Sequence, residues 1–264
     1  MTTPTIEPWV RIFSDPVATG RAAAADIAAE LRRVISRKGE ARVIFASAPS
    51  QAETINALLA EPDINWSAVT AFHMDEYIGL DADDPAGFGN WLKKALWNRV
   101  PLGTAHVLDP TGGAAAEARR YAELLAAAPI DIVCLGIGVN GHIAFNDPPV
   151  ADFDDPQPVK VVELDEICRQ QQVDDECFDS FDDVPTRALT LSVPRLLDAA
   201  RLFCVVSKES KAEAVRATLL DPLGEHCPST ILRTHPGCTL YLDADAASRL
   251  RATLGATVRP TLGA

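Results

Sequence analysis

IDIVCLGIGVNGHIAFNDPP, residues 130–149, is the stretch that decides the fold class. The residues at 130–135 are mostly apolar, which is typical of a strand buried on both faces of a parallel sheet. A glycine-rich loop follows directly, and Pro148 and Pro149 leave no room for a helix after it. The stretch therefore predicts a buried strand that delivers a polar loop to the edge of a sheet.

Apolar strands and amphipathic helices alternate along the rest of the chain. This alternation predicts an α/β fold with a mostly parallel sheet and helices on both faces. Because no repeat, linker or break in composition separates two cores, we expect a single domain over 1–264. Further strands are predicted at 41–46, 68–74, 159–164, 188–193, 201–207 and 238–243, and helices at 17–38, 51–60, 88–100, 114–127, 210–220 and 245–254.

The composition excludes several classes of protein. With 264 residues, 47% of them hydrophobic, the chain can bury a substantial core, which excludes wholesale disorder. A net charge of −13 disfavours nucleic acid as a partner, because a polyphosphate needs a basic face. No uncharged run approaches the roughly 18 residues that cross a membrane, so we expect a cytoplasmic protein. Six scattered cysteines without a CxxC pair predict neither a zinc site nor a disulfide framework.

The segment 152–183 is unusually acidic. It contains twelve acidic residues, and its only basic residues are Lys160 and Arg169. Repulsion between like charges should loosen such a segment, so we predict a lid at 152–184. A solvated acidic surface is the alternative interpretation.

Ligands of an open parallel sheet bind beyond the carboxyl ends of its strands, so the residues after each strand are the candidates. Asp75 follows the strand at 68–74 and is the candidate base. His142 lies in the glycine-rich loop, where Asn140 and Asp147 can hold one imidazole nitrogen and leave the other free to move a proton. The alternative is that Asp75 and His142 only cap the turns in which they lie.

The same loop contains the pattern GxGxxG at Gly136, Gly138 and Gly141, which dinucleotide sites also use. Such a site needs a helix that begins at the glycines, and the two prolines exclude that helix. We expect instead that the glycines let the backbone approach a small ligand closely.

Two other kinds of site are disfavoured. His73, Asp75, His142 and Asp147 are the residues that could bind a metal, but HExxH and paired-histidine spacings are absent, so no metal is predicted. A GxSxG elbow is absent as well, which disfavours a serine hydrolase.

At these residues the sequence resembles a known family. FHMDEYIGL (72–80) and LGIGVNGHIAFNDPP (135–149) resemble the paired signature of glucosamine-6-phosphate deaminases. The related 6-phosphogluconolactonases share the fold, but their histidine is followed by a sequence that resembles GHTASLFP, where this chain has GHIAFNDP. The resemblance implies a Rossmann-like α/β fold and an aldose–ketose isomerisation coupled to loss of ammonia, giving fructose 6-phosphate. It implies no metal and no organic cofactor.

The resemblance also implies roles for individual residues. Asp75 would move a proton between C2 and C1 of the opened sugar, and His142 would open the ring, with Asn140 and Asp147 as the partners that orient the histidine. Lys211 matches the family's phosphate lysine. The residues expected to bind the substrate are Ser47, Ala48, Ser50, Glu76, Gly138, Gly141 and Lys211.

The phosphate-binding residues depart from the family pattern. SAPSQ (47–51) replaces a glycine-rich loop, and Pro49 has no amide to offer. Asp174 stands near the position of an arginine in the family's lid. The departures suggest a ligand other than a standard hexosamine 6-phosphate, because an acidic residue repels a phosphate dianion. The cations that could substitute for the arginine are Lys208, Arg169 and Arg195.

The predicted function is therefore an isomerase and deaminase of an amino-sugar phosphate, a small-molecule substrate. Two alternatives stay open: a phosphosugar lactonase in which His142 activates water, and a sugar-phosphate-binding protein without turnover. The sequence does not decide between a monomer and a homo-oligomer.

Overall fold

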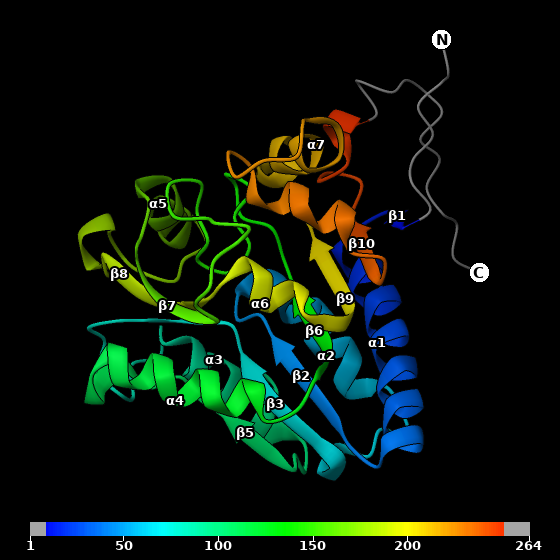
Figure 1. Cartoon of the computed structure of the whole chain (residues 1–264). Helices are drawn as coiled ribbons and strands as arrows, with labels where there is room; N and C mark the ends of the chain where they lie inside the picture. Colours follow the sequence, from blue (N-terminus) through cyan, green and yellow to red (C-terminus); the bar gives the residue numbers. More distant parts are fainter. Residues whose placement is uncertain (1–8, 251–264) are drawn as a thin grey trace.

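The computed structural model describes residues 9–250, and over this range the chain forms a seven-stranded sheet in which all neighbouring strands are parallel (Figure 1). The strand order is β1, β10, β9, β6, β2, β3, β5. The predicted Rossmann-like α/β fold is thereby confirmed. The strands of this sheet are β1 (Val10–Ile12), β2 (Ala41–Phe45), β3 (Val69–His73), β5 (Thr104–His106), β6 (Ile130–Leu135), β9 (Ala199–Val206) and β10 (Cys238–Leu242).

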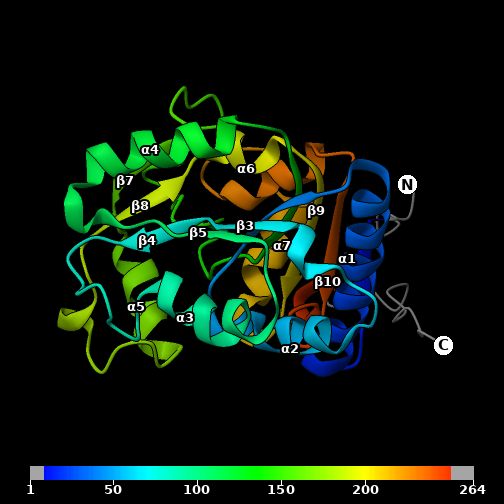
Figure 2. The same cartoon turned by 90° about the horizontal axis from the view of Figure 1, so that it is seen from below.

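Helices cover both faces of the sheet, because the side chains of each strand alternate between two apolar cores. In β6, Ile132 and Cys134 share one core with α1, α2 and α3, whereas Val133 and Leu135 share the other with α4, α6 and α7. Figure 2 shows α4 and α6 on one side of the sheet and α2 and α3 on the other. The helices are α1 (Pro16–Lys38), α2 (Ala52–Ala60), α3 (Phe88–Ala95), α4 (Ala114–Ala126), α5 (Glu166–Asp174), α6 (Val193–Leu197) and α7 (Ala212–Leu220).

A second, antiparallel sheet is present, and the sequence did not predict it. It consists of β4 (Asp75–Tyr77), β8 (Arg187–Leu191) and β7 (Val159–Glu163), in that order. The predicted strands at 159–164 and 188–193 therefore lie outside the parallel sheet. The chain passes directly from β3 into β4, so Asp75 sits at the junction of the two sheets.

The acidic segment is partly built into the fold. It contributes β7 and α5, and Val162, Leu164 and Cys168 share a small core with Tyr77 and Phe145. Figure 1 shows α5, β7 and β8 grouped together at one side, away from β10. The lid motion predicted from the charge of this segment stays a prediction.

Other sequence expectations differ from the structure in detail. The helix expected at 88–100 ends at Ala95, and a 3₁₀ turn at Trp97–Arg99 follows it. Of the helix expected at 245–254, residues 248–250 are helical and residues 251–254 lie outside the described residues, as do both ends of the predicted domain 1–264. No helix within 9–250 has the length and apolar composition that crossing a bilayer requires.

Candidate active site

A small cavity lies at the carboxyl ends of the parallel strands. These ends are level, since Phe45 of β2 pairs with His73 of β3 and with Cys134 of β6. The cavity is lined by segments that follow four strands, namely 46–51 after β2, Asp75 after β3, 136–138 and His142 after β6, and Lys211 after β9. One side is closed by Gln171, Gln172 and Asp175, on α5 and at its C-terminus.

Asp75 is buried, with 5% of its surface exposed, and its Oδ1 has no hydrogen-bond partner among the described residues. Burial raises the pKa of Asp75 well above its usual value, and the carboxylates of Glu76 and Asp147 raise it further. Since the ionised form of such a carboxyl group is a stronger base, Asp75 is suited to removing a proton from a substrate in the cavity.

His142 is held by the two residues that the sequence singled out. Its Nδ1 lies 2.8 Å from Oδ1 of Asp147. Asn140 donates from Nδ2 to the same oxygen at 3.0 Å and accepts from the backbone N of His142 at 3.1 Å. Burial alone would raise the pKa of Asp147, but the contacts with His142 and Asn140 outweigh it and lower that pKa. Because Asp147 occupies Nδ1, Nε2 is the ring nitrogen left for a ligand.

Gly138 and Gly141 shape the loop around His142. The backbone N of Gly138 donates to the carbonyl of His142 at 2.9 Å, and a Cβ at Gly138 would lie 2.1 Å from Cε1 of His142. Gly141 has a φ of +84°, and a Cβ there would lie 2.5 Å from Sγ of Cys227. Gly138 lines the cavity, whereas Gly141 does not. The described residues 136–158 contain no helix, as the prolines predicted.

The segment 47–51 and Lys211 supply groups that suit an anion. Oγ of Ser47 is buried and has no hydrogen-bond partner among the described residues. Lys211 is 4% exposed, and burial lowers the pKa of its ammonium group to about 8. Ala48 and Ser50 also line the cavity. An unpartnered hydroxyl and a buried ammonium group in one cavity are groups that an anionic ligand can satisfy.

Glu76, expected to bind the substrate, lies outside this cavity and has another role. Its carboxylate accepts hydrogen bonds from the backbone N–H groups of Tyr77 at 3.0 Å, Phe88 at 2.9 Å and Gly89 at 2.8 Å. Phe88 and Gly89 are the first residues of α3. Glu76, twelve residues earlier in the chain, therefore caps the N-terminus of that helix.

Replacing Glu76 with Ala is expected to lower the free energy of unfolding by about 1–3 kcal/mol, because it leaves buried amides without an acceptor. Urea unfolding followed by circular dichroism measures the change. Glu123→Ala, which removes an exposed carboxylate from α4, is the matched control and should change the value by less than about 0.5 kcal/mol. Equal stability of the two variants would contradict the capping role.

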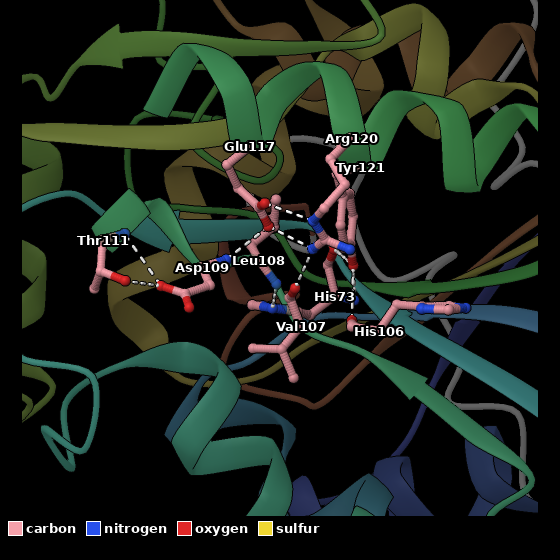
Figure 3. Close-up of polar contacts among 9 residues, drawn as sticks. All are labelled: His73, His106, Val107, Leu108, Asp109, Thr111, Glu117, Arg120 and Tyr121. Carbon is pink, nitrogen blue, oxygen red and sulfur yellow. Dashed lines mark hydrogen bonds and ion pairs between the residues drawn. The ribbon is translucent and has the colours of Figure 1, made fainter. Parts of the chain in front are cut away.

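His73 belongs to a buried polar network rather than to the cavity (Figure 3). Its Nε2 accepts from the backbone N of Leu108 at 2.8 Å, and its own N donates to the hydroxyl of Tyr121 at 2.9 Å. The backbone N of Asp109 donates to Glu117 at 2.7 Å. Burial lowers the pKa of His73 to about 3, so its imidazole is neutral at physiological pH. The network connects β5 and α4 to the end of β3, immediately before Asp75.

The structure distinguishes between two neighbouring acidic residues at the end of α5. Asp174 is exposed, and its carboxylate accepts from Gln170, outside the cavity. Asp175 lines the cavity instead, and its Oδ1 lies 2.8 Å from Nζ of Lys208. The expectation that Asp174 faces the ligand is therefore wrong for the described geometry, since the turn of the helix directs the next residue inward.

Of the three cations considered as substitutes for the arginine, two are occupied elsewhere. Arg169 donates to the carbonyls of Phe181 and Val184, both within the acidic segment. Arg195 pairs with Asp198 at 2.9 Å. Lys208 is the one that contacts a residue of the cavity.

Sequence reasoning missed the inward face of α5. Gln171, Gln172 and Asp175 follow helical spacing, so the periodicity could have identified them once a helix was assigned to this segment. Cys168, on the same helix, is fully buried beside His142 and Asp147, and one ligand atom of each of the three lies within 4.8 Å of the others. No local pattern in the sequence signals this contact.

The chain is similar to known proteins over most of its length. The family model of glucosamine-6-phosphate isomerases and 6-phosphogluconolactonases matches residues 14–241. A glucosamine-6-phosphate deaminase of Listeria monocytogenes is 34% identical over 215 residues, 80% of this chain and 89% of that protein. One of Streptococcus pneumoniae is 36% identical over 195 residues, 73% of this chain and 81% of that protein.

Solved structures of two enzymes are also similar to this chain. A monomeric glucosamine-6-phosphate deaminase superposes with a TM-score of 0.82 at 29% identity, covering 90% of this chain and 98% of that one. A 6-phosphogluconolactonase of Shewanella baltica shares the fold, with a TM-score of 0.71 at 20% identity and coverage of 92% of this chain and 100% of that one. The chain is therefore an enzyme of the glucosamine-6-phosphate isomerase and 6-phosphogluconolactonase family.

Proposed function

We propose that this enzyme converts glucosamine 6-phosphate into fructose 6-phosphate and ammonia. The observation that carries the proposal is that an unpartnered carboxylate, Asp75, and a histidine backed by a carboxylate, His142, line one cavity. The relatives that are 34% and 36% identical to this chain are deaminases of that sugar phosphate, which supports the same substrate here.

The two groups divide the reaction between them. His142, whose Nδ1 is held by Asp147, transfers a proton at the ring oxygen through Nε2 and so opens the sugar ring. Asp75 then removes the proton from C2 of the open aldose, and the electron pair moves toward C1 and its oxygen, which takes up a proton. Return of the proton to C1 leaves an iminium group at C2. Water adds to this carbon, and ammonia leaves.

The coupled assay with glucosamine 6-phosphate tests this proposal by following fructose 6-phosphate and ammonia together. Equimolar release of the two products is the expected result. Hydrolysis of 6-phosphogluconolactone without any release of ammonia from the amino sugar would contradict the proposal and identify a lactonase. Binding of the sugar phosphate without turnover would also contradict it.

Lys211 makes anion binding depend on pH. Its pKa is lowered to about 8, and an anion favours the protonated form, so binding of fructose 6-phosphate should weaken above pH 8, by up to about tenfold per pH unit. Titration calorimetry between pH 7 and pH 9.5 measures this slope. In Lys211→Arg the guanidinium stays protonated, so the slope should disappear; an unchanged slope in that variant would contradict the assignment.

The predicted lid also belongs to this proposal. The cavity has a volume of about 70 Å³, well below the roughly 300 Å³ at which small-molecule sites begin, so the proposal includes an outward movement of α5 that enlarges it for a sugar phosphate. We place the reaction in the cytoplasm with no nucleic acid partner. The six free cysteines and the net charge of −13 support these two assignments.

A further inference from the structure

The anion-binding part of the cavity contains a carboxylate of its own. Asp175 lines the same cavity as Lys211, and its side chain is largely buried, with 13% of its surface exposed. Its charge acts on Lys211, since it raises the pKa of that ammonium group against the larger effect of burial. A terminal anionic group bound beside Lys211 therefore also encounters the carboxylate of Asp175.

Lys208 is held in a strained conformation next to this carboxylate. Its φ is +83°, a left-handed value that residues other than glycine rarely adopt, at a typical cost of about 1–3 kcal/mol. The backbone N of Lys208 donates to Asp243 at 3.1 Å, which stabilises the turn. From this turn its ammonium group reaches Asp175 at 2.8 Å. The geometry thus directs one of the two nearby lysines to Asp175 rather than to a ligand.

We propose that Asp175 is a specificity-determining residue that weakens the binding of a phosphate dianion more than the binding of a terminal group with one negative charge. Asp175 offsets one of the two ammonium charges beside it, since it pairs with Lys208 and also acts on Lys211. A negative charge repels a dianion twice as strongly as it repels a monoanion at the same place. The inference rests on the proposed function, because it concerns the phosphate of that substrate.

The test is the affinity of wild-type protein and Asp175→Asn for fructose 6-phosphate and fructose 6-sulfate, measured by titration calorimetry at pH 7.5. At this pH the phosphate is mostly a dianion, whereas the sulfate ester is a monoanion. Asp175→Asn should raise the affinity for fructose 6-phosphate about tenfold and the affinity for fructose 6-sulfate only about threefold. The second factor is the square root of the first, because the monoanion gains half as much free energy as the dianion. Asparagine keeps the size of the side chain and can still accept from Gln171.

Two further variants isolate the effect. Asp174→Asn removes the same charge one residue earlier, outside the cavity, and should change either affinity by less than about twofold. Asp175→Ser also removes the charge and should raise the two affinities by the same two factors, so the role can be tested even where Asp175→Asn does not fold.

The outcomes separate this inference from the proposed function. Equal changes for both ligands, or no tightening in Asp175→Asn, would overturn the role of Asp175, whether or not the protein releases ammonia from glucosamine 6-phosphate. Absence of ammonia release together with the predicted shift in selectivity would overturn the reaction and leave the role of Asp175 supported. Binding of neither ligand to any variant would overturn both.

Discussion

Asp75→Asn is expected to lower kcat for glucosamine 6-phosphate by about 10³-fold and to leave the affinity for fructose 6-phosphate within about threefold of wild type. An amide has the same shape as the carboxylate but cannot accept the proton from C2. The substitution should cause little strain, because Oδ1 of Asp75 has no hydrogen-bond partner among the described residues that a wrongly oriented amide would disturb. Steady-state kinetics and calorimetry give the two quantities.

The control for this variant is Asp83→Asn, at an exposed position outside the cavity, which should retain full activity. The pH profile adds a second readout. Asp75 acts as a base only when ionised, and burial raises its pKa, so kcat/KM should fall as the pH drops through that raised pKa. A variant that keeps more than about one tenth of the wild-type kcat would exclude Asp75 as the base.

Gly138→Ala should also lower kcat strongly, although it removes no functional group. The added Cβ would lie between 2.1 and 2.3 Å from three atoms of the His142 ring, far inside van der Waals contact. The ring must then leave its place beside Asp147, and a displacement of about 1 Å from the reactive geometry costs on the order of 10²-fold in rate. We expect kcat to fall by about that factor, as measured in the coupled assay.

Gly112→Ala is the matched control, because a Cβ at Gly112 meets nothing within 4 Å. It should leave kcat unchanged. The thermal stability of Gly138→Ala should be measured alongside, so that a loss of rate can be attributed to the folded protein. Wild-type kcat in a folded Gly138→Ala protein would show that the position of the His142 ring is not required for catalysis.

Much of the fold follows from periodicity alone. The helix predicted at 17–38 forms as α1, which begins after Asp15, whose carboxylate accepts from the backbone N of Ala18, and ends at Gly39 with a φ of +83°. These are local signals, and the sequence carries them in full. The short edge strands β1 and β5, with three residues each, were missed because their pairing depends on neighbours distant in the chain.

The antiparallel sheet could not be predicted for the same reason. VKVVEL at 159–164 is as apolar as a strand of the parallel sheet, and only its pairing with β8 reveals the difference. The position of Asp75 at the junction of the two sheets depends on this pairing, since β4 pairs with β8. Sequence spacing indicated the chemistry of that residue but not the structure that buries it.

In the candidate site, too, contacts within one loop could be predicted from the sequence, whereas contacts between separate segments could not. Asn140, His142 and Asp147 lie within eight residues, so their mutual contacts could be predicted from one loop. The assignment of Glu76 to the substrate failed to anticipate that its carboxylate caps α3, twelve residues further along the chain. The roles of the other predicted substrate-binding residues stay predictions, and all of them except Gly141 line the cavity.

The fate of the hydrogen at C2 tests the central claim most directly. Glucosamine 6-phosphate carrying deuterium at C2 is converted by the enzyme, and the sugar phosphate that forms is examined by mass spectrometry and NMR. If Asp75 moves this proton, deuterium should leave C2 in step with ammonia release and part of it should appear at C1, and neither should occur in Asp75→Asn. Release of ammonia with the deuterium retained at C2, which would give an aldose 6-phosphate instead of fructose 6-phosphate, would contradict the isomerisation and with it the assignment of the base.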